Sequence, residues 1–159
     1  MVNTVGKETF VADRAYLSGF LDGDGAIMAT IEKHQEKKFG FRVRIVIKIS
    51  QKDENALRWF LDTFGVGKIR QNIRSFDWII KNQTDAKYLI DLMLPYLKAK
   101  KKQAEIARSI LEVNSDVDSK DQFLAIARLA DSLSFLNVRS KNRRTNYTTM
   151  IEEVFSRND

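Results

Sequence analysis

The sequence contains no cysteine, and its only histidine is His34. Without cysteine the chain forms no disulfide, holds no zinc through thiolates and carries no thiol nucleophile. A metal site built from several histidines of one chain is excluded as well. Any metal ion must therefore be bound through oxygen atoms, which favours magnesium, manganese or calcium.

Long apolar runs are also missing from the sequence. No stretch approaches the roughly 20 apolar residues that a membrane span needs, and residues 1–10 lack the apolar segment of a secretory signal. With 159 residues, 43% of them apolar, the chain is long enough for one hydrophobic core, so we expect a single domain over residues 1–159. We expect an intracellular protein with no membrane partner, from an organelle (chloroplast or mitochondrion) or a prokaryotic cytoplasm.

The spacing of apolar residues predicts an α+β domain with the order α-β-β-α-β-β-α and C-terminal helices, the helical tail covering about residues 118–159. Apolar residues recur at helical spacing in some segments and alternate with polar residues in others. The expected helices span residues 13–23, 53–64, 84–95, 100–114, 121–137 and 147–155, and the expected strands span residues 26–33, 41–49, 68–73 and 76–81.

Local patterns add detail to these elements. Asp13 and Thr84 are expected to cap the first and third helices, because short polar side chains accept bonds from free N–H groups there. Alternation in the second hairpin places four apolar residues on its inner face: Ile69, Ile73, Trp78 and Ile80. The outer face is expected to carry Arg70, Asn72, Asp77, Ile79 and Lys81.

Positive charge is concentrated in the two expected hairpins. Residues 30–51 hold six basic and two acidic side chains, a net +4, and residues 66–81 hold four basic and one acidic, a net +3. Together they exceed the net charge of the whole chain, +6. A solvated sheet face is one interpretation. The preference for Arg, Lys, Asn and Gln favours the other, contact with phosphates and base edges of DNA.

Two further basic clusters lie outside the hairpins. Lys98 and Lys100–Lys102 stand at the start of a helix, where positive charge opposes the helix dipole, so an anionic neighbour is expected there. The second cluster, between the last two helices, comprises Arg139, Lys141, Arg143 and Arg144. Each cluster is either a solvated run or a phosphate contact.

The segment 17–25, LSGFLDGDG, contains the most informative pattern. Ala15, Gly19 and Gly23 recur every four residues and form a small-residue face on one helix. This face packs either against another helix of the same chain or against a second copy of itself. Asp24 is either an ordinary turn residue or, near Asp22 and the Gly23 carbonyl, part of an oxygen-rich metal site.

Residues 17–25 resemble the signature of the LAGLIDADG homing endonucleases, and the resemblance extends over most of the chain. It includes residues 49–52 (ISQK), 64–67 (FGVG) and 95–104 (PYLKAKKKQA). The chain is most similar to the single-motif, homodimeric proteins encoded within group I introns. The resemblance implies the fold of that family, in which a four-stranded antiparallel saddle binds DNA.

The resemblance also implies roles for individual residues. Asp24 matches the catalytic acid that binds metal, and Gly23 matches the residue whose carbonyl is a metal ligand. Gln51 and Lys100 match residues that position solvent and stabilise the water network or phosphate. Asp22 is expected to have a structural role only. The implied cofactor is Mg2+, with Mn2+ substituting and Ca2+ binding without cleavage.

One departure from the family pattern concerns an arginine, which close relatives carry shortly after the glutamine that Gln51 matches. This chain has Asp53-Glu54-Asn55-Ala56 at that place, and Arg58 is a candidate substitute one turn further on.

The implied DNA contacts come from the outward residues of both hairpins and the later basic segment. The lone His34 has a second interpretation as a solvated loop residue. The expected contacts are Thr30, Glu32, His34, Arg42, Arg44, Lys48, Arg70, Asn72, Asp77, Ile79, Arg139, Lys141 and Arg143.

One motif supplies one acid, so cutting both strands of DNA requires a homodimer with Ala15, Gly19 and Gly23 at its interface. The target should then be near-palindromic, on the order of 18 base pairs, and hydrolysed with magnesium. The alternatives are a non-cleaving DNA-binding protein or RNA-splicing maturase of the same fold, the latter with RNA as a partner, and a scaffold that binds nucleic acid without sequence preference.

Overall fold

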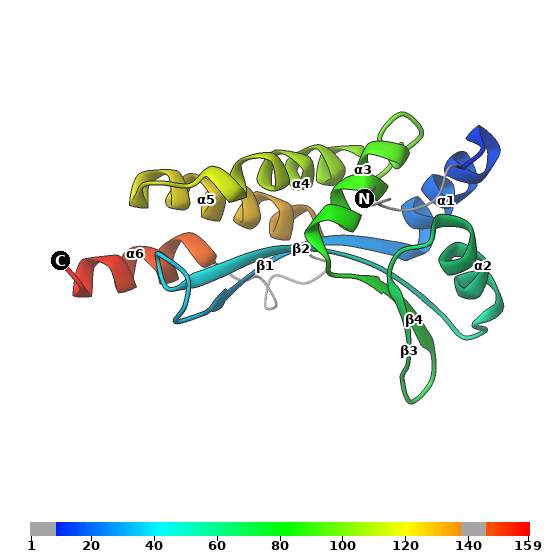
Figure 1. Cartoon of the computed structure of the whole chain (residues 1–159), viewed down its shortest axis with the longest axis horizontal. Helices are drawn as coiled ribbons and strands as arrows, with labels where there is room; N and C mark the ends of the chain where they lie inside the picture. Colours follow the sequence, from blue (N-terminus) through cyan, green and yellow to red (C-terminus); the bar gives the residue numbers. More distant parts are fainter. Residues whose placement is uncertain (1–8, 138–145) are drawn as a thin grey trace, which may run out of the picture.

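The computed structural model describes residues 9–137 and 146–159, which form a four-stranded sheet with helices on one of its faces (Figure 1). The predicted α+β order is confirmed. The elements are α1 (Val11–Asp24), β1 (Gly25–Lys33), β2 (Phe41–Gln51), α2 (Asn55–Phe64), β3 (Lys68–Gln71), β4 (Phe76–Ile80), α3 (Gln83–Met93), α4 (Lys101–Val113), a 3-10 turn at Asn114–Asp116, α5 (Lys120–Asn137) and α6 (Tyr147–Arg157).

The sheet is antiparallel, with the strand order β1-β2-β4-β3. In the first hairpin Ile27 pairs with Ile47 and Ile31 with Val43, so the predicted apolar alternation is in register on one face. Strand β2 then pairs with β4 through its second half only, from Ile47 to Gln51. The β1–β2 hairpin therefore extends well beyond the second hairpin, and Figure 1 shows the two diverging.

The hydrophobic core lies between the inner face of the sheet and the helices. One cluster contains fully buried residues from four elements: Leu17 of α1, Ile45 and Ile47 of β2, Leu89 of α3 and Ile110 of α4. The same cluster includes Phe123 and Phe155 of α5 and α6, and α5 packs against β1. The expected C-terminal helices therefore share the core of the sheet. Burying one such side chain contributes about 1.5–3 kcal/mol to stability.

An aromatic group attaches α2 to the second hairpin. Phe60 stacks on Trp78 with ring centroids 5.3 Å apart, and the Trp78 indole donates a hydrogen bond to the Val66 carbonyl at 2.9 Å. The amphipathic pattern of residues 53–64 correctly predicted this packing face, although α2 begins at Asn55.

Among the helices of residues 9–137 and 146–159, none has the length and apolar character of a membrane span.

The two expected helix caps were wrong. Helix α1 begins at Val11, and the Phe10 carbonyl accepts the first bonds, so Asp13 lies inside the first turn. Helix α3 is capped by Asn82, whose side chain accepts a bond from the Asp85 amide at 3.0 Å. Both helices begin one or two residues earlier than expected, α1 at Val11 and α3 at Gln83.

The second hairpin is also shorter than predicted. Its strands end at Gln71 and begin again at Phe76, so Ile73 lies in the connecting turn and is fully exposed instead of facing the core. Alternation holds only while backbone pairing continues, and here it stops two residues earlier than the pattern indicated. Val46 differs from its expected environment in the opposite way: it lies on the outer face of β2 but is buried.

We predict that Gly67→Ala destabilises the protein more than Gly40→Ala. Both glycines have positive φ, 86° and 77°, which costs alanine about 1–2 kcal/mol. A Cβ at Gly67 would also lie 2.7 Å from Trp78 Nε1, whereas a Cβ at Gly40 meets nothing within 4 Å. The clash should add about 1–3 kcal/mol to the loss of unfolding free energy, measured by urea denaturation. Equal losses for the two variants would contradict this packing.

Candidate metal centre and nucleic-acid interface

The end of α1 runs directly into β1 without a loop. The Gly25 amide donates to the Leu21 carbonyl and the chain turns into the strand at that residue. A Cβ at Gly25 would lie 2.6 Å from Leu21 Cδ1 and 2.9 Å from Leu21 Cα, so only glycine permits this close turn. Asp24 is thereby held, exposed, at the junction of the helix and the sheet.

Asp24 lies beside Gln51, the last residue of β2. The Gln51 side-chain amide donates a hydrogen bond to Asp24 Oδ2 at 3.0 Å. The β1–β2 pairing, in which Gly25 opposes Ile49, brings these two residues together. Two residues that the sequence singled out for one site are thus in direct contact.

Asp22 binds the connection that leads into α4. Its carboxylate accepts hydrogen bonds from the backbone amides of Lys98 and Lys100, at 2.8 and 2.9 Å. The Lys100 ammonium donates in turn to the Asp22 carbonyl at 2.6 Å. The structural role expected of Asp22 is consistent with these bonds, and they place Lys100 at the same helix end as Asp24.

The donors at this end of α1 suit a hard divalent cation, but one chain supplies few of them. The Asp24 carboxylate and the Gly23 backbone are both exposed, and carboxylate and carbonyl oxygens are the ligands that magnesium and calcium take. Within residues 9–137 and 146–159, no group of three or more His, Cys, Asp or Glu side chains could hold a metal ion. A cation at this end of the helix would therefore find few ligands among the described residues of one chain.

The small-residue face of α1 has no partner within the described chain. Ala15, Gly19 and Gly23 are exposed, and a Cβ added at either glycine would meet nothing within 4 Å. The opposite face of α1 is the one that packs internally, through Leu17 and Leu21, which are fully buried. Among the described residues, no other helix therefore packs against Gly19 or Gly23, as the first of the two expected alternatives would require.

The outer face of the first hairpin carries an ion-paired cluster. Glu32 Oε1 accepts hydrogen bonds from Arg42 Nε at 2.9 Å and from Arg44 Nη2 at 2.8 Å. The hydrogen bond from Arg42 and the positive charge of both arginines hold the pKa of Glu32 below its ordinary value, despite partial desolvation. Thr30 lies opposite Arg44 and donates to its carbonyl.

The outer face of the second hairpin contains a buried carboxylate. Asp77 is only 2% exposed and accepts hydrogen bonds from Ser50 at 2.5 Å, Asn72 at 2.6 Å and Arg70 at 3.1 Å. Burial raises the pKa of Asp77, but the bonds from Ser50, Asn72 and Arg70 outweigh it and hold that pKa below its ordinary value. Asp77 thus supports Arg70 and Asn72 from beneath, whereas Arg70 itself is exposed.

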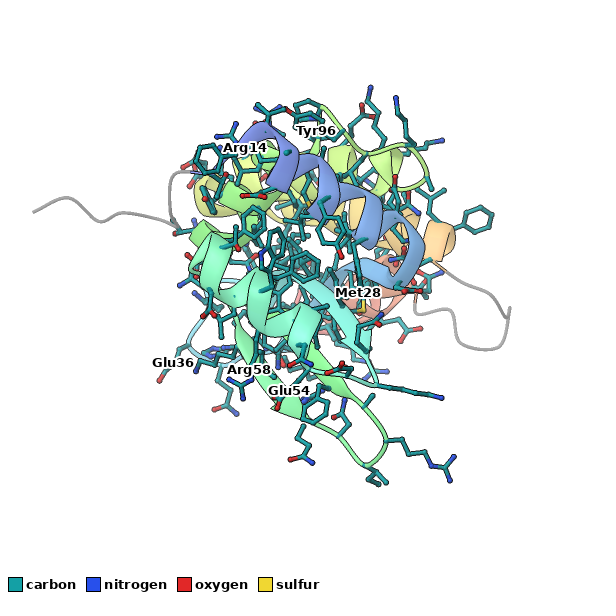
Figure 2. The ribbon with its side chains drawn as sticks, turned by 90° about the vertical axis from the view of Figure 1, so that its right-hand side faces the viewer. Arg14, Met28, Glu36, Glu54, Arg58 and Tyr96 are labelled. Carbon is teal, nitrogen blue, oxygen red and sulfur yellow. The ribbon has the colours of Figure 1, made fainter. Side chains whose placement is uncertain are left out.

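Sequence reasoning missed Ser50, because nothing in the sequence indicated that β2 pairs with β4. Ser50 is the direct cross-strand partner of Asp77 in that pairing. The Arg58 side chain, the candidate substitute for the family arginine, forms an ion pair with Glu54 at 3.0 Å, and Figure 2 shows the two residues near the start of α2.

The remaining expected contacts are placed as follows. Lys48 and Ile79 are direct cross-strand partners. His34 follows β1 in the hairpin loop, and its Nδ1 atom is buried without a hydrogen-bond partner in the part of the chain that the structure describes. Arg139, Lys141 and Arg143 lie outside the described residues.

These features describe an α+β domain with one open, basic sheet face and an acidic side chain at the end of a helix whose small-residue face is uncovered. The sequence model of the family described as LAGLIDADG endonuclease matches this chain over residues 17–110. The chain is also 35% identical over 140 residues to the DNA endonuclease I-CreI of Chlamydomonas reinhardtii, covering 85% of this chain and 84% of the relative. This protein therefore belongs to the LAGLIDADG endonuclease family.

Two further similarities involve a second DNA endonuclease. The DNA endonuclease I-CvuI of Chlorella vulgaris is 26% identical over 128 residues, covering 77% of this chain and 78% of the relative. A crystal structure of the homing endonuclease I-CvuI, in complex with its target in the presence of calcium, has a TM-score of 0.83 at 24% identity, covering 92% of this chain and 94% of that one. The expected fold is confirmed.

We predict that Asp77→Asn lowers the unfolding free energy at pH 7 by about 1–3 kcal/mol, because charge-assisted bonds to three donors are weakened. The pKa of Asp77 is lowered by folding, so its ionised form stabilises the protein above the ordinary value, 3.8. That contribution disappears as the pH falls through the folded pKa. The difference between the variant and the natural protein should therefore shrink below about pH 4, and a constant difference down to pH 2 would contradict it.

Proposed function

We propose that this protein is a site-specific homing endonuclease that acts as a homodimer and hydrolyses both strands of a long, near-palindromic DNA target with magnesium. One observation carries this proposal: the Asp24–Gln51 pair is exposed where the basic sheet meets the unpartnered small-residue face of α1. The relatives I-CreI and I-CvuI are DNA endonucleases, which supports the same activity here.

A two-fold axis along the exposed face of α1 would complete the site. Two copies of this helix can approach closely because Ala15, Gly19 and Gly23 have little or no side chain. The exposed apolar residues Val11 and Tyr16 lie on the same helix and would gain cover in such a contact. Since Gly23 and Asp24 end the helix, the contact would bring the two Asp24 carboxylates toward each other.

Within that dimer the donors of two chains would hold the metal: the Asp24 carboxylate and the Gly23 carbonyl of each. When bound, divalent magnesium activates water and neutralises charge on the scissile phosphate and leaving oxygen. Other cations follow from the same oxygen ligands: manganese should substitute, and calcium should bind without supporting cleavage.

The neighbouring side chains then have distinct tasks. Gln51, fixed by its bond to Asp24, retains a carbonyl oxygen that can orient solvent toward the phosphate. Lys100 is anchored through its own amide to Asp22, so its positive charge stays beside the centre and can stabilise the phosphate. Asp22 acts through Lys100 and is a positioning residue.

The open sheet face supplies the DNA-binding surface. No helix among the described elements lies across this face (Figure 1). Its outward residues include Thr30, Lys48, Arg70, Asn72 and Ile79, and its hairpins hold the excess positive charge of the chain. Double-stranded DNA, with a regular array of phosphates and a groove wide enough for a β-ribbon, suits this surface.

We predict that Asp24→Asn reduces cleavage at least about a thousandfold, since a neutral amide cannot replace the carboxylate that binds metal, a loss of several kcal/mol. The target is first obtained by selecting cleaved molecules from a randomised DNA library with magnesium. Single-turnover cleavage of that target is then compared with Asp118→Asn, a control at an exposed position in the connection before α5. Full activity of Asp24→Asn would contradict the proposed centre.

We predict that Gly19→Leu weakens the dimer at least about a hundredfold, because two-fold symmetry brings the enlarged side chain into the interface twice. Sedimentation equilibrium measures the effect. Ala125→Leu is the matched control, because Ala125 is an exposed small residue on α5. A Gly19→Leu protein that remains as dimeric as the control would show that subunits meet elsewhere.

A further inference from the structure

The Glu32 cluster differs from a simple surface ion pair, because one carboxylate oxygen holds two guanidinium groups. Glu32 and Arg42 are direct cross-strand partners, and Arg44 projects on the same face two residues further along β2. Arg42 donates to Glu32 Oε1 through both Nε and Nη2, and Arg44 donates to the same atom through Nη2. Both arginines are therefore fixed in direction before any ligand arrives.

The hydrogen-bonding inventory shows what remains available. Glu32 occupies the Nε–Nη2 edge of Arg42, which leaves that arginine's Nη1 group and the second Nη2 hydrogen directed away from the carboxylate. These two groups form the end of the planar fork that matches the O6 and N7 acceptors of guanine. The Arg42 side chain is 35% exposed and that of Arg44 is 27% exposed, so both remain accessible from the sheet face.

The carboxylate also argues against a purely electrostatic role. Two arginines against one glutamate leave the cluster with a net charge of +1, less than the arginines alone would offer to phosphates. A negative group at a DNA surface opposes phosphate binding. The Glu32 carboxylate is accounted for if the orientation of Arg42 and Arg44 matters more for DNA recognition than their total positive charge.

We propose that Glu32 positions Arg42 and Arg44 as a paired reader of guanine at the outer end of each half-site. This inference rests on the proposed function, because it takes the open sheet face as the DNA-binding surface. Arg42 and Arg44 are the specificity-determining residues, and Glu32 is the positioning residue.

The strand geometry gives the place of the guanines. Arg44 and Arg42 precede Gln51 by seven and nine residues along β2, which corresponds to about 23 and 30 Å of extended strand. At 3.4 Å per base pair, the contacts fall roughly seven to nine base pairs from the centre of cleavage. The β3–β4 hairpin does not reach this region, since β4 pairs with β2 only from Ile47 onward.

The test is selection of bound DNA from a randomised library by the full-length protein in the presence of a chelator, so that the readout is binding without cleavage. The natural protein should enrich guanine at the outer positions. Arg42→Lys and Arg44→Lys keep the charge but lose the planar fork, and each should lower guanine preference about 5- to 150-fold at its position. Glu32→Gln should lower the preference at both positions.

The matched control is Glu36→Gln, which makes the same change of charge at an exposed site in the loop of the same hairpin. It should retain the guanine preference. Glu32→Gln should in addition bind non-specific DNA more tightly and with a salt dependence steeper by up to about one counterion. Absence of outer guanines from sites bound by the natural protein, or their retention by Glu32→Gln, would overturn the inference.

Failure of this inference is distinguishable from failure of the proposed function. A protein that selects outer guanines but never cuts the selected DNA in magnesium would refute the endonuclease proposal and leave the guanine reader standing. A protein that cuts a defined site without guanine preference at these positions would do the reverse.

Discussion

The carboxylate of Asp22 holds the end of α1 against the start of α4, and the geometry of the proposed centre depends on that contact. It accepts hydrogen bonds from the backbone amides of Lys98 and Lys100, and the Lys100 ammonium donates a hydrogen bond to the Asp22 backbone carbonyl. The turn at Gly25 then sends the chain directly into β1. With no loop between helix and sheet, Asp24 has a fixed position beside Gln51. Charge-assisted bonds of this kind are strong enough to maintain it.

The same junction explains why one chain supplies only half of the proposed metal-binding centre. It leaves the small face of α1 open and places one carboxylate, that of Asp24, at the end of that face. The two hairpins share a feature on the open sheet face: Glu32 accepts hydrogen bonds from Arg42 and Arg44, and Asp77 accepts them from Arg70 and Asn72. The arginine side chains are thus ordered in advance, which would lower the entropy lost on binding DNA at the proposed surface.

The sequence predicted the features that depend on local pattern. The alternation in residues 41–49 correctly placed the core-facing residues of β2, although Val46 on its other face is buried too. The spacing of Gly19 and Gly23 marked one face of α1, but it left open whether that face packs within the chain. Features that depend on tertiary pairing were missed. The pairing of Ser50 with Asp77, which turns an apparently outward carboxylate into a buried one, needs the β2–β4 register. Ile73 was expected in the core because apolar alternation does not reveal where a turn begins.

The central claim is that two copies of this chain share one metal-binding centre on the axis between their α1 helices. A crystal structure of the protein with its selected DNA target and manganese, located by anomalous scattering, tests it most directly. The account predicts manganese between the two Asp24 carboxylates, with the small faces of α1 in contact. Manganese bound by residues of one chain only, or subunits that meet through another surface, would contradict it.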